Sequence, residues 1–289
     1  MPGAVRRRIP RPIRRRLRQL AAWGRRTRRG LSRRFDAAPS ADALITLAAY
    51  RLQADAVPLP SEAPDCVVAK NQHGSYCVPR SSLHRPAARA VVNAGVWESK
   101  TLDFLRSAGR DGDIVHAGTF FGDFIPALAR SRERDACVWA FEPNRESYEC
   151  ARLTVMLNDL ENVMLSHAGL SAESATALLA TRNAKGLPLS GGSHLVLNPA
   201  RAPGIDNEQV DLVAVDDIVS SDRRVAVIQL DVEGHEQEAL TGAMRTITRW
   251  RPLIVLETVP PQSWIAEHLA PLGYRVAGNV DANTVLRQR

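Results

Sequence analysis

From residue 111 onward, short apolar runs alternate with segments of helical periodicity, the pattern of βαβ units around a parallel sheet. The apolar runs predict strands at residues 114–117, 137–141, 163–167, 225–230 and 253–256. Helices are expected between them, over residues 122–131, 145–158, 236–249 and 261–272. The end of the chain differs, because residues 274–280 and 284–287 flank a short polar turn and predict an antiparallel hairpin. These patterns indicate an α/β fold.

Arginine is concentrated at one end of the chain. Residues 1–35 hold fourteen arginines and no acidic residue, whereas the remainder holds 24 basic and 31 acidic residues. We therefore predict a disordered arginine-rich tail over residues 1–35, a helical and irregular extension over 36–90, and a larger domain over 91–289. The tail could contact a membrane surface or another polyanion; a solvated extension without a partner is the alternative.

The spacing of the cysteines and the length of the apolar runs indicate where in the cell the protein is located. The four cysteines have no Cys-x-x-Cys spacing, which predicts reduced thiols in a cytosolic protein. No apolar run approaches the roughly 20 residues of a membrane span. The sequence therefore predicts a soluble, cytoplasmic protein, peripheral to a membrane only if the tail binds one. The oligomeric state stays open.

A glycine-bounded turn follows the first predicted strand. In an open α/β sheet, ligands bind outside the carboxyl ends of the strands. Gly118-Thr-Phe-Phe-Gly122 lies there, and its glycines let backbone approach a ligand. The turn lacks the G-x-G-x-x-G spacing, which argues against a dinucleotide pyrophosphate. Taken alone, the turn also fits a purely structural role.

Polar residues follow the next two predicted strands. Glu142 lies 24 residues after Gly118, near the offset of about 20 residues at which a carboxylate binds the ribose hydroxyls of a nucleoside cofactor. Glu142 could instead cap the following helix. His167, after the third strand, could border an adenine ring, or fill the edge of the core.

The segment VIQLDVEGHEQEALTGA places Asp231, Glu233 and His235 at the end of a buried strand. Glu257 ends the next strand, and in a sheet ordered 3-2-1-4-5 it would lie beside Asp231. Paired carboxylates raise one another's pKa and can act as a base, or they can bind a cation. Glu233 and Glu257 are candidate substrate contacts, and the use of a metal stays open.

The region from residue 171 to about 207 is expected to be irregular. Long loops in compact domains are usually functional or disordered. Gly191-Gly192-Ser193 favours a ligand-facing loop, with Ser193 as a substrate contact, although a plain surface excursion also explains it.

Together, DIVHAGTFFGDF, AFEPNRESYECARLTVMLN, VAVDDI, IQLDVEGHEQEALTGA and PLIVLET resemble the FkbM family of S-adenosylmethionine-dependent methyltransferases over roughly residues 95–260. The resemblance implies a Rossmann-like class I fold, a seven-stranded, mostly parallel sheet with a reversed last strand. It implies S-adenosylmethionine as cofactor and methyl transfer to oxygen, often on sugars, glycans or secondary metabolites. Within 91–289, Gly118 and Gly122 would line its methionine end, and Thr119 between them would be a further cofactor contact. Glu142 would hold its ribose, and Asp231 would face the substrate.

The chain departs from the family at two positions of the glycine turn. His116 stands where the family commonly has an acidic residue, and Phe120 where it has asparagine. Asp123 or Glu98 could supply the missing carboxylate for the amino group of the cofactor. Whether His116 contacts the cofactor or packs beneath the turn stays open.

Methyl transfer from a sulfonium requires alignment of the acceptor and removal of its proton. Asp231 is our first candidate for the base and His235 the second. Each also fits a plain role, Asp231 as a helix cap and His235 as a solvent-facing residue of the first turn. Two other functions remain alternatives: a nicotinamide-dependent oxidoreductase, and a non-catalytic Rossmann-like binding protein that uses its basic tail.

Overall fold

The computed structural model describes residues 64–133, 135–196 and 207–288. All of them belong to one compact unit, Ala41–Arg289. The predicted tail over residues 1–35 and much of the predicted extension over 36–90 lie outside the described residues. Among the described residues, no helix is long and apolar enough to cross a membrane. The cytoplasmic location stays a prediction.

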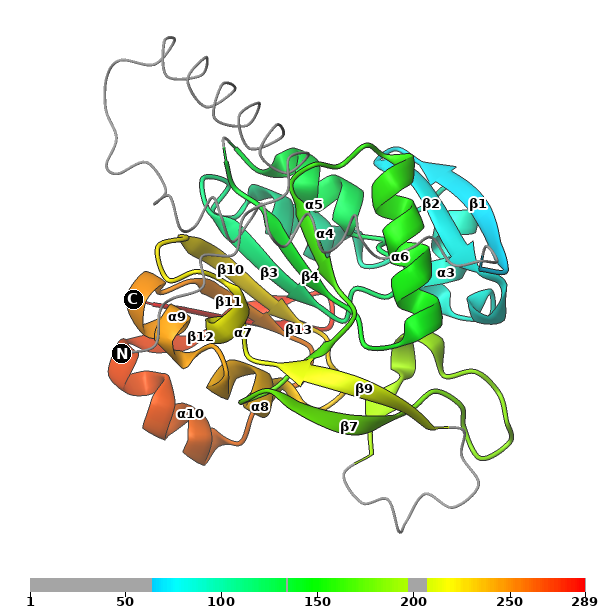
Figure 1. Ribbon diagram of the computed structural model, residues 1–289. Coiled ribbons are helices and arrows are strands. Elements are labelled where there is room, and N and C mark those ends of the chain that lie inside the picture. Colours follow the sequence, from blue (N-terminus) through cyan, green and yellow to red (C-terminus); the bar gives the residue numbers. More distant parts are fainter. Residues whose placement is uncertain (1–63, 134, 197–206, 289) are drawn as a thin grey trace, which may run out of the picture. The chain divides into compact units, whose positions relative to one another are not determined.

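A seven-stranded sheet has the order β12-β13-β11-β10-β3-β4-β5 (Figure 1). Within this sheet, β3, β4, β5, β10 and β11 pair in parallel. Strand β13 runs antiparallel to both of its neighbours, β11 and β12. This confirms the predicted α/β fold with a reversed last strand. The strands are β3 (Asp113–Ala117), β4 (Val138–Phe141), β5 (Val163–Ser166), β10 (Val225–Leu230), β11 (Leu253–Leu256), β12 (Tyr274–Val280) and β13 (Asn283–Gln288).

Helices cover both faces of this sheet, because its central strands are apolar on both sides. One face packs against α4 (Ser99–Ser107), α5 (Ile125–Ser131) and α6 (Arg145–Leu157). The other packs against α7 (Val215–Ile218), α8 (Glu236–Thr241), α9 (Met244–Trp250) and α10 (Gln262–His268).

The helix expected over residues 236–249 is interrupted between α8 and α9. The interruption lies at Gly242, where an added Cβ would be 2.0 Å from the carbonyl oxygen of Ser171. The chain needs this close backbone approach to bring the start of a second sheet against the helical layer. A tertiary contact has therefore overridden a continuous helical pattern.

That second sheet occupies much of the region expected to be irregular. Its order is β6-β9-β7-β8, with β6 (Gly169–Leu170), β7 (Ala175–Ala180), β8 (His194–Leu195) and β9 (Asn207–Val213). Figure 1 shows β7 and β9 lying together as a ribbon beside the end of the large sheet. Val210 and Leu212 of β9 are buried against Leu179, and polar residues alternate with them. The expectation of a loop over 171–207 was wrong for β7 and β8, which form through long-range pairing.

A hairpin precedes the large sheet. Its strands are β1 (Cys66–Asn71) and β2 (Gly74–Pro79), followed by α3 (Pro86–Val92). Cys66 and Cys77 form a disulfide across it, whereas Cys137 and Cys150 are buried and keep their thiols. The prediction that all four cysteines are reduced was wrong for this pair, because strand pairing brings together two thiols with no recognisable spacing.

Replacing Cys66 and Cys77 with serine is expected to lower the free energy of unfolding by about 3 kcal/mol. The two cysteines are 11 residues apart, and a cross-link over a loop of that length limits the unfolded chain by about this much. Urea denaturation of the parent with and without reductant provides the measurement. The double variant serves as control and should not respond to reductant; a parent that is equally insensitive would contradict the expectation.

A buried ion pair joins the amino-terminal end of β3 to the segment just before β10. The Asp113 carboxylate accepts hydrogen bonds from Arg223 Nε at 2.5 Å and Nη2 at 2.6 Å. It also accepts from the backbone N–H of Cys137 at 2.8 Å and from Trp139 Nε1 at 2.7 Å. The Asp113 and Arg223 side chains are 2% and 7% exposed, so each depends on the other for its solvation.

Candidate active site

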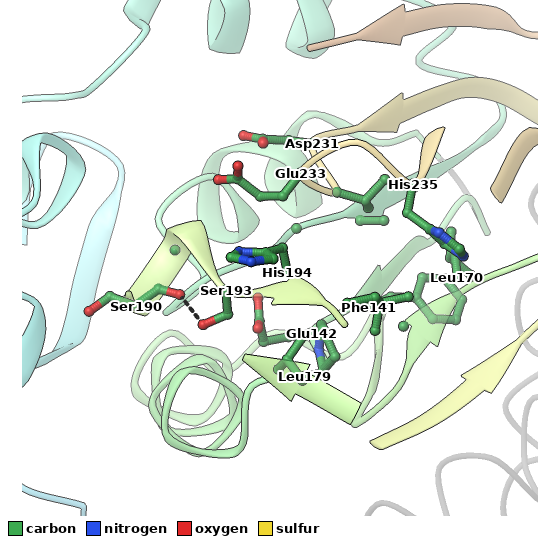
Figure 2. Close-up of a pocket in the computed structure, with 17 residues that line it drawn as sticks. Phe141, Glu142, Leu170, Leu179, Ser190, Ser193, His194, Asp231, Glu233 and His235 are labelled. Atoms are coloured by element: carbon green, nitrogen blue, oxygen red, sulfur yellow. Dashed lines mark hydrogen bonds between the residues drawn. The ribbon is translucent and has the colours of Figure 1, made fainter. Parts of the chain in front are cut away.

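A pocket opens at the carboxyl ends of β3, β4 and β10, the edge at which an open α/β sheet binds its ligands. The second sheet supplies the facing wall (Figure 2). The residues that line it are Ala117, Gly118, Phe141, Glu142, Pro143, Gly169, Leu170, Leu179, Ser190, Gly191, Ser193, His194, Leu195, Asp231, Val232, Glu233 and His235. The structure thus brings Gly118, Glu142, Ser193 and Asp231 into one cavity, as the sequence predicts for a shared ligand site.

The glycine turn forms one corner of the pocket. Gly118 has a φ of +78°, and an added Cβ would lie 1.8 Å from the carbonyl oxygen of Asp231. The turn and the end of β10 are therefore held in direct contact. Gly122 has a φ of +81° and faces α6, with an added Cβ 3.4 Å from Ala151 Cα. Thr119 is fully buried and donates its hydroxyl to the carbonyl of His116. Of these three candidate residues, Gly118 lines the pocket.

Glu142 lies on the pocket wall, at the end of β4 (Figure 2). Its carboxylate accepts the backbone N–H of Phe120 at 2.6 Å and that of Asn144 at 2.9 Å. Burial raises the pKa of Glu142 to about 8, and these two hydrogen bonds oppose the rise. Each carboxylate oxygen keeps a second lone pair. The fixed carboxylate is therefore suited to accept the two hydroxyls of a ribose, and the site fits a nucleoside cofactor.

Asp231 and Glu257 end adjacent parallel strands. Leu230 pairs with Leu256, so the two carboxylates follow at the same level of the sheet. Their oxygens and one oxygen of Glu233 lie within 4.8 Å of one another. Burial raises the pKa of Asp231 well above its ordinary value. The hydrogen bond that protonated Asp231 donates to Glu257 and the nearby charge of Glu233 raise it further. This arrangement can hold a proton between two carboxyl groups; it also offers oxygens to a divalent cation, whose use stays open.

His235 is the residue before α8 and lines the pocket. Its Nε2 lies 3.1 Å from the hydroxyl of Ser171, and its Nδ1 lies 3.7 Å from a carboxylate oxygen of Glu238. Burial lowers the pKa of His235, so the neutral ring is favoured. Because both ring nitrogens already face protein groups, the geometry favours Asp231 over His235 as the base.

His116 lies inside the sheet and does not line the pocket. Its Nδ1 is hydrogen-bonded to the side-chain oxygen of Gln229 on β10, and its ring stacks on Phe124 at 5.9 Å between centroids. Burial lowers the pKa of His116 to about 4, so the ring is neutral. The structure therefore places this histidine beneath the glycine turn.

Glu98, Asp123 and His167, the other predicted cofactor contacts, are not among the residues that line the pocket. Glu98 accepts a hydrogen bond from Asn283 at 2.7 Å. Burial raises the pKa of Asp123 to about 7, and the nearby charge of Glu98 contributes to the rise. Glu98 and Asp123 thus lie close together and keep their place as candidates for an amino group. His167 stacks on Tyr148 at 4.7 Å between ring centroids.

Sequence reasoning missed the apolar part of the second-sheet wall. Leu170, Leu179 and Leu195 form it, and His194 lies beside them near Glu233 (Figure 2). Their positions depend on how β6, β7 and β8 pair, which local periodicity does not encode. The alternation of polar and apolar residues over 209–212 is the signal in the sequence that could have revealed this sheet.

Comparison with protein families decides the assignment. The model of the methyltransferase FkbM domain matches residues 116–276, more than half of the chain. The chain belongs to the FkbM methyltransferase family. The predicted family and the methyltransferase class are confirmed, and the nicotinamide-dependent oxidoreductase is no longer an alternative.

Solved structures with a similar fold include methyltransferases. Methyltransferase FkbM from Methylobacillus flagellatus is 15% identical, with a TM-score of 0.40 over 85% of this chain. This FkbM chain spans 59% of that protein's length. TYW2 from M. jannaschii, solved with AdoMet, is 11% identical, with a TM-score of 0.42 over 79% of this chain and 89% of that one. No curated protein matches the chain.

Proposed function

We propose that this FkbM protein methylates a hydroxyl oxygen of a small polyhydroxylated acceptor, such as a sugar, a glycan or a secondary metabolite. One observation carries the proposal: a buried carboxylate suited to a ribose, Glu142, lies in the same pocket as Asp231, whose partner Glu257 can share a proton. Cofactor and acceptor would therefore meet between these two walls.

When bound, S-adenosylmethionine supplies a methyl carbon activated by its sulfonium. Glu142 would accept hydrogen bonds from the ribose hydroxyls and so hold the cofactor in place. Asp231 would accept the proton of the acceptor hydroxyl, which makes that oxygen the nucleophile for the methyl group. Glu257 stabilises the proton on Asp231 through their hydrogen bond. Leu170, Leu179 and Leu195 limit water on the other wall.

Replacing Glu142 with alanine is expected to weaken binding of S-adenosylhomocysteine about 100-fold, because two hydrogen bonds to the ribose are lost. Isothermal titration calorimetry measures this. Glu146→Ala is the matched control, since Glu146 is exposed on α6 and outside the pocket; its affinity should stay within about twofold. A parent protein without affinity for S-adenosylhomocysteine would contradict the proposed function, and so would full affinity in Glu142→Ala.

A further inference from the structure

The pocket is rich in carboxylates and poor in cations. Glu142, Asp231 and Glu233 line it, and among the described lining residues there is no lysine or arginine. A ligand that carries a carboxylate of its own would meet repulsion on this wall. It therefore needs a cation from just outside the lining residues.

Arg85 occupies that position. It is the residue before α3 and is half-buried. An added Cβ at Gly192 would lie 2.9 Å from Arg85 Nη2 and 3.4 Å from Nη1. The guanidinium thus packs against the backbone of a turn whose neighbours, Gly191 and Ser193, line the pocket. Gly192 leaves the space that the guanidinium occupies.

The positive charge of Arg85 affects the pKa of Glu233, which lines the pocket. Burial and the neighbouring Glu257 raise the pKa of Glu233, whereas Arg85 and His194 lower it. Figure 2 shows the side chains of Glu233 and His194 near each other at the same part of the pocket. Arg85 is therefore close enough to act on a ligand beside Glu233.

The guanidinium N–H groups of Arg85 are available to a ligand. Within residues 64–133, 135–196 and 207–288, its guanidinium takes part in no hydrogen bond or ion pair of the structure, in contrast to Arg223, which is fully engaged by Asp113 and the carbonyl of Asp135. A planar guanidinium can bind a carboxylate through two parallel hydrogen bonds.

We propose that Arg85 binds a carboxylate of the ligand held in this pocket. The inference rests on the proposed function. The carboxylate has two possible sources with the same chemistry: the amino-acid part of the cofactor, and an acidic acceptor such as a sugar acid. In either case Arg85 selects for the acid and against its neutral counterpart.

The first arm of the test distinguishes the cofactor as the source. Isothermal titration compares S-adenosylhomocysteine with 5′-methylthioadenosine, which lacks the amino-acid part. If the cofactor is the source, Arg85→Met weakens binding of S-adenosylhomocysteine about 10- to 50-fold and leaves 5′-methylthioadenosine unchanged. Arg89→Met is the matched control, because Arg89 is exposed one turn further along α3.

The second arm addresses the acceptor. D-glucuronate and D-glucose are titrated into protein saturated with S-adenosylhomocysteine. If the acceptor is the source, the parent binds glucuronate at least 10-fold more tightly than glucose, and Arg85→Met removes this preference. Gly192→Ala provides a second variant, since its added Cβ displaces the guanidinium without removing the charge; it should reproduce the selective loss.

The possible outcomes distinguish a failure of the proposed role of Arg85 from a failure of the proposed function. Unchanged affinity for S-adenosylhomocysteine in Arg85→Met, together with equal binding of glucuronate and glucose by the parent, overturns the role of Arg85. A parent that binds neither S-adenosylhomocysteine nor 5′-methylthioadenosine overturns the proposed function instead. Circular dichroism of each variant verifies that the fold is retained.

Discussion

Replacing Asp231 with asparagine is expected to lower kcat about 1,000-fold, because asparagine cannot accept the proton of the acceptor hydroxyl. The substitution preserves the size of the side chain, so affinity for S-adenosylhomocysteine should change by no more than about threefold. Single-turnover methylation, with an acceptor found by screening sugar and natural-product hydroxyls, measures the effect. Glu267→Gln is the control, since Glu267 is exposed on α10 and outside the pocket lining. A variant with at least a tenth of the parent activity would exclude Asp231 as the base.

The same substitution, Asp231→Asn, is expected to increase stability even though it lowers kcat, and the size of this increase depends on pH. The pKa of Asp231 is raised in the folded protein, mainly by burial and by its contact with Glu257. The folded state therefore loses stability as the pH rises from the unfolded pKa of about 4 through the raised folded value. Asparagine removes this loss. Thermal unfolding should show Asp231→Asn gaining stability relative to the parent at pH 8 but not at pH 4, and a gain that does not depend on pH would contradict this.

Glu257→Gln tests whether Asp231 acts alone as the base or shares its proton with Glu257. Without the second carboxylate, Asp231 loses a cause of its raised pKa, so its deprotonated form is present at lower pH. The pH profile of kcat should therefore move toward lower pH while activity at its optimum is largely kept. An unmoved profile would show that Glu257 does not share the proton.

Removing Arg223 is expected to cause the largest loss of stability. Arg223→Met leaves the Asp113 carboxylate buried, 2% exposed, without its counter-ion. Such a loss costs about 3–5 kcal/mol, because the remaining charge cannot regain its hydration. Urea denaturation gives the free energy of unfolding directly.

The neighbouring arginine supplies the control for this prediction. Arg224 forms an ion pair with Asp111 at 2.6 Å, but the two side chains are 48% and 59% exposed. Exposed pairs contribute about 0–1 kcal/mol, so Arg224→Met should be close to the parent. Equal losses in the two variants would show that charge at this position, not burial of the pair, determines stability.

Much of the large sheet could be predicted from local patterns. The runs at 225–230 and 253–256 coincide with β10 and β11, because buried parallel strands require continuous apolar segments. The terminal hairpin was also predicted, and it places the reversed β13 between β11 and β12. The helix boundaries were less certain: α5 begins at Ile125 rather than at residue 122, since Gly122 adopts a left-handed φ in the turn before it.

Some residues of the candidate site could be identified from the sequence, and others could not. Glu142, Asp231 and Glu257 were identifiable because parallel strands bring their carboxyl ends to one edge, so position along each strand predicts proximity. Arg85 gave no such signal, since it precedes a separate helix, α3, and packs beside the pocket against Gly192. His116 was recognised as unusual, but its partner Gln229 is 113 residues away.

By itself, the sequence determined the α/β class, the strand ends that carry chemistry and the resemblance to the FkbM family, because each depends on periodicity or on residues close together in the chain. The tertiary structure alone decided the second sheet, the Cys66–Cys77 disulfide, the engagement of His235 by Ser171 and the place of Arg85 beside the pocket. These depend on contacts between distant segments, whose pairing is selected by burial and hydrogen bonding of the whole fold and not by any local pattern.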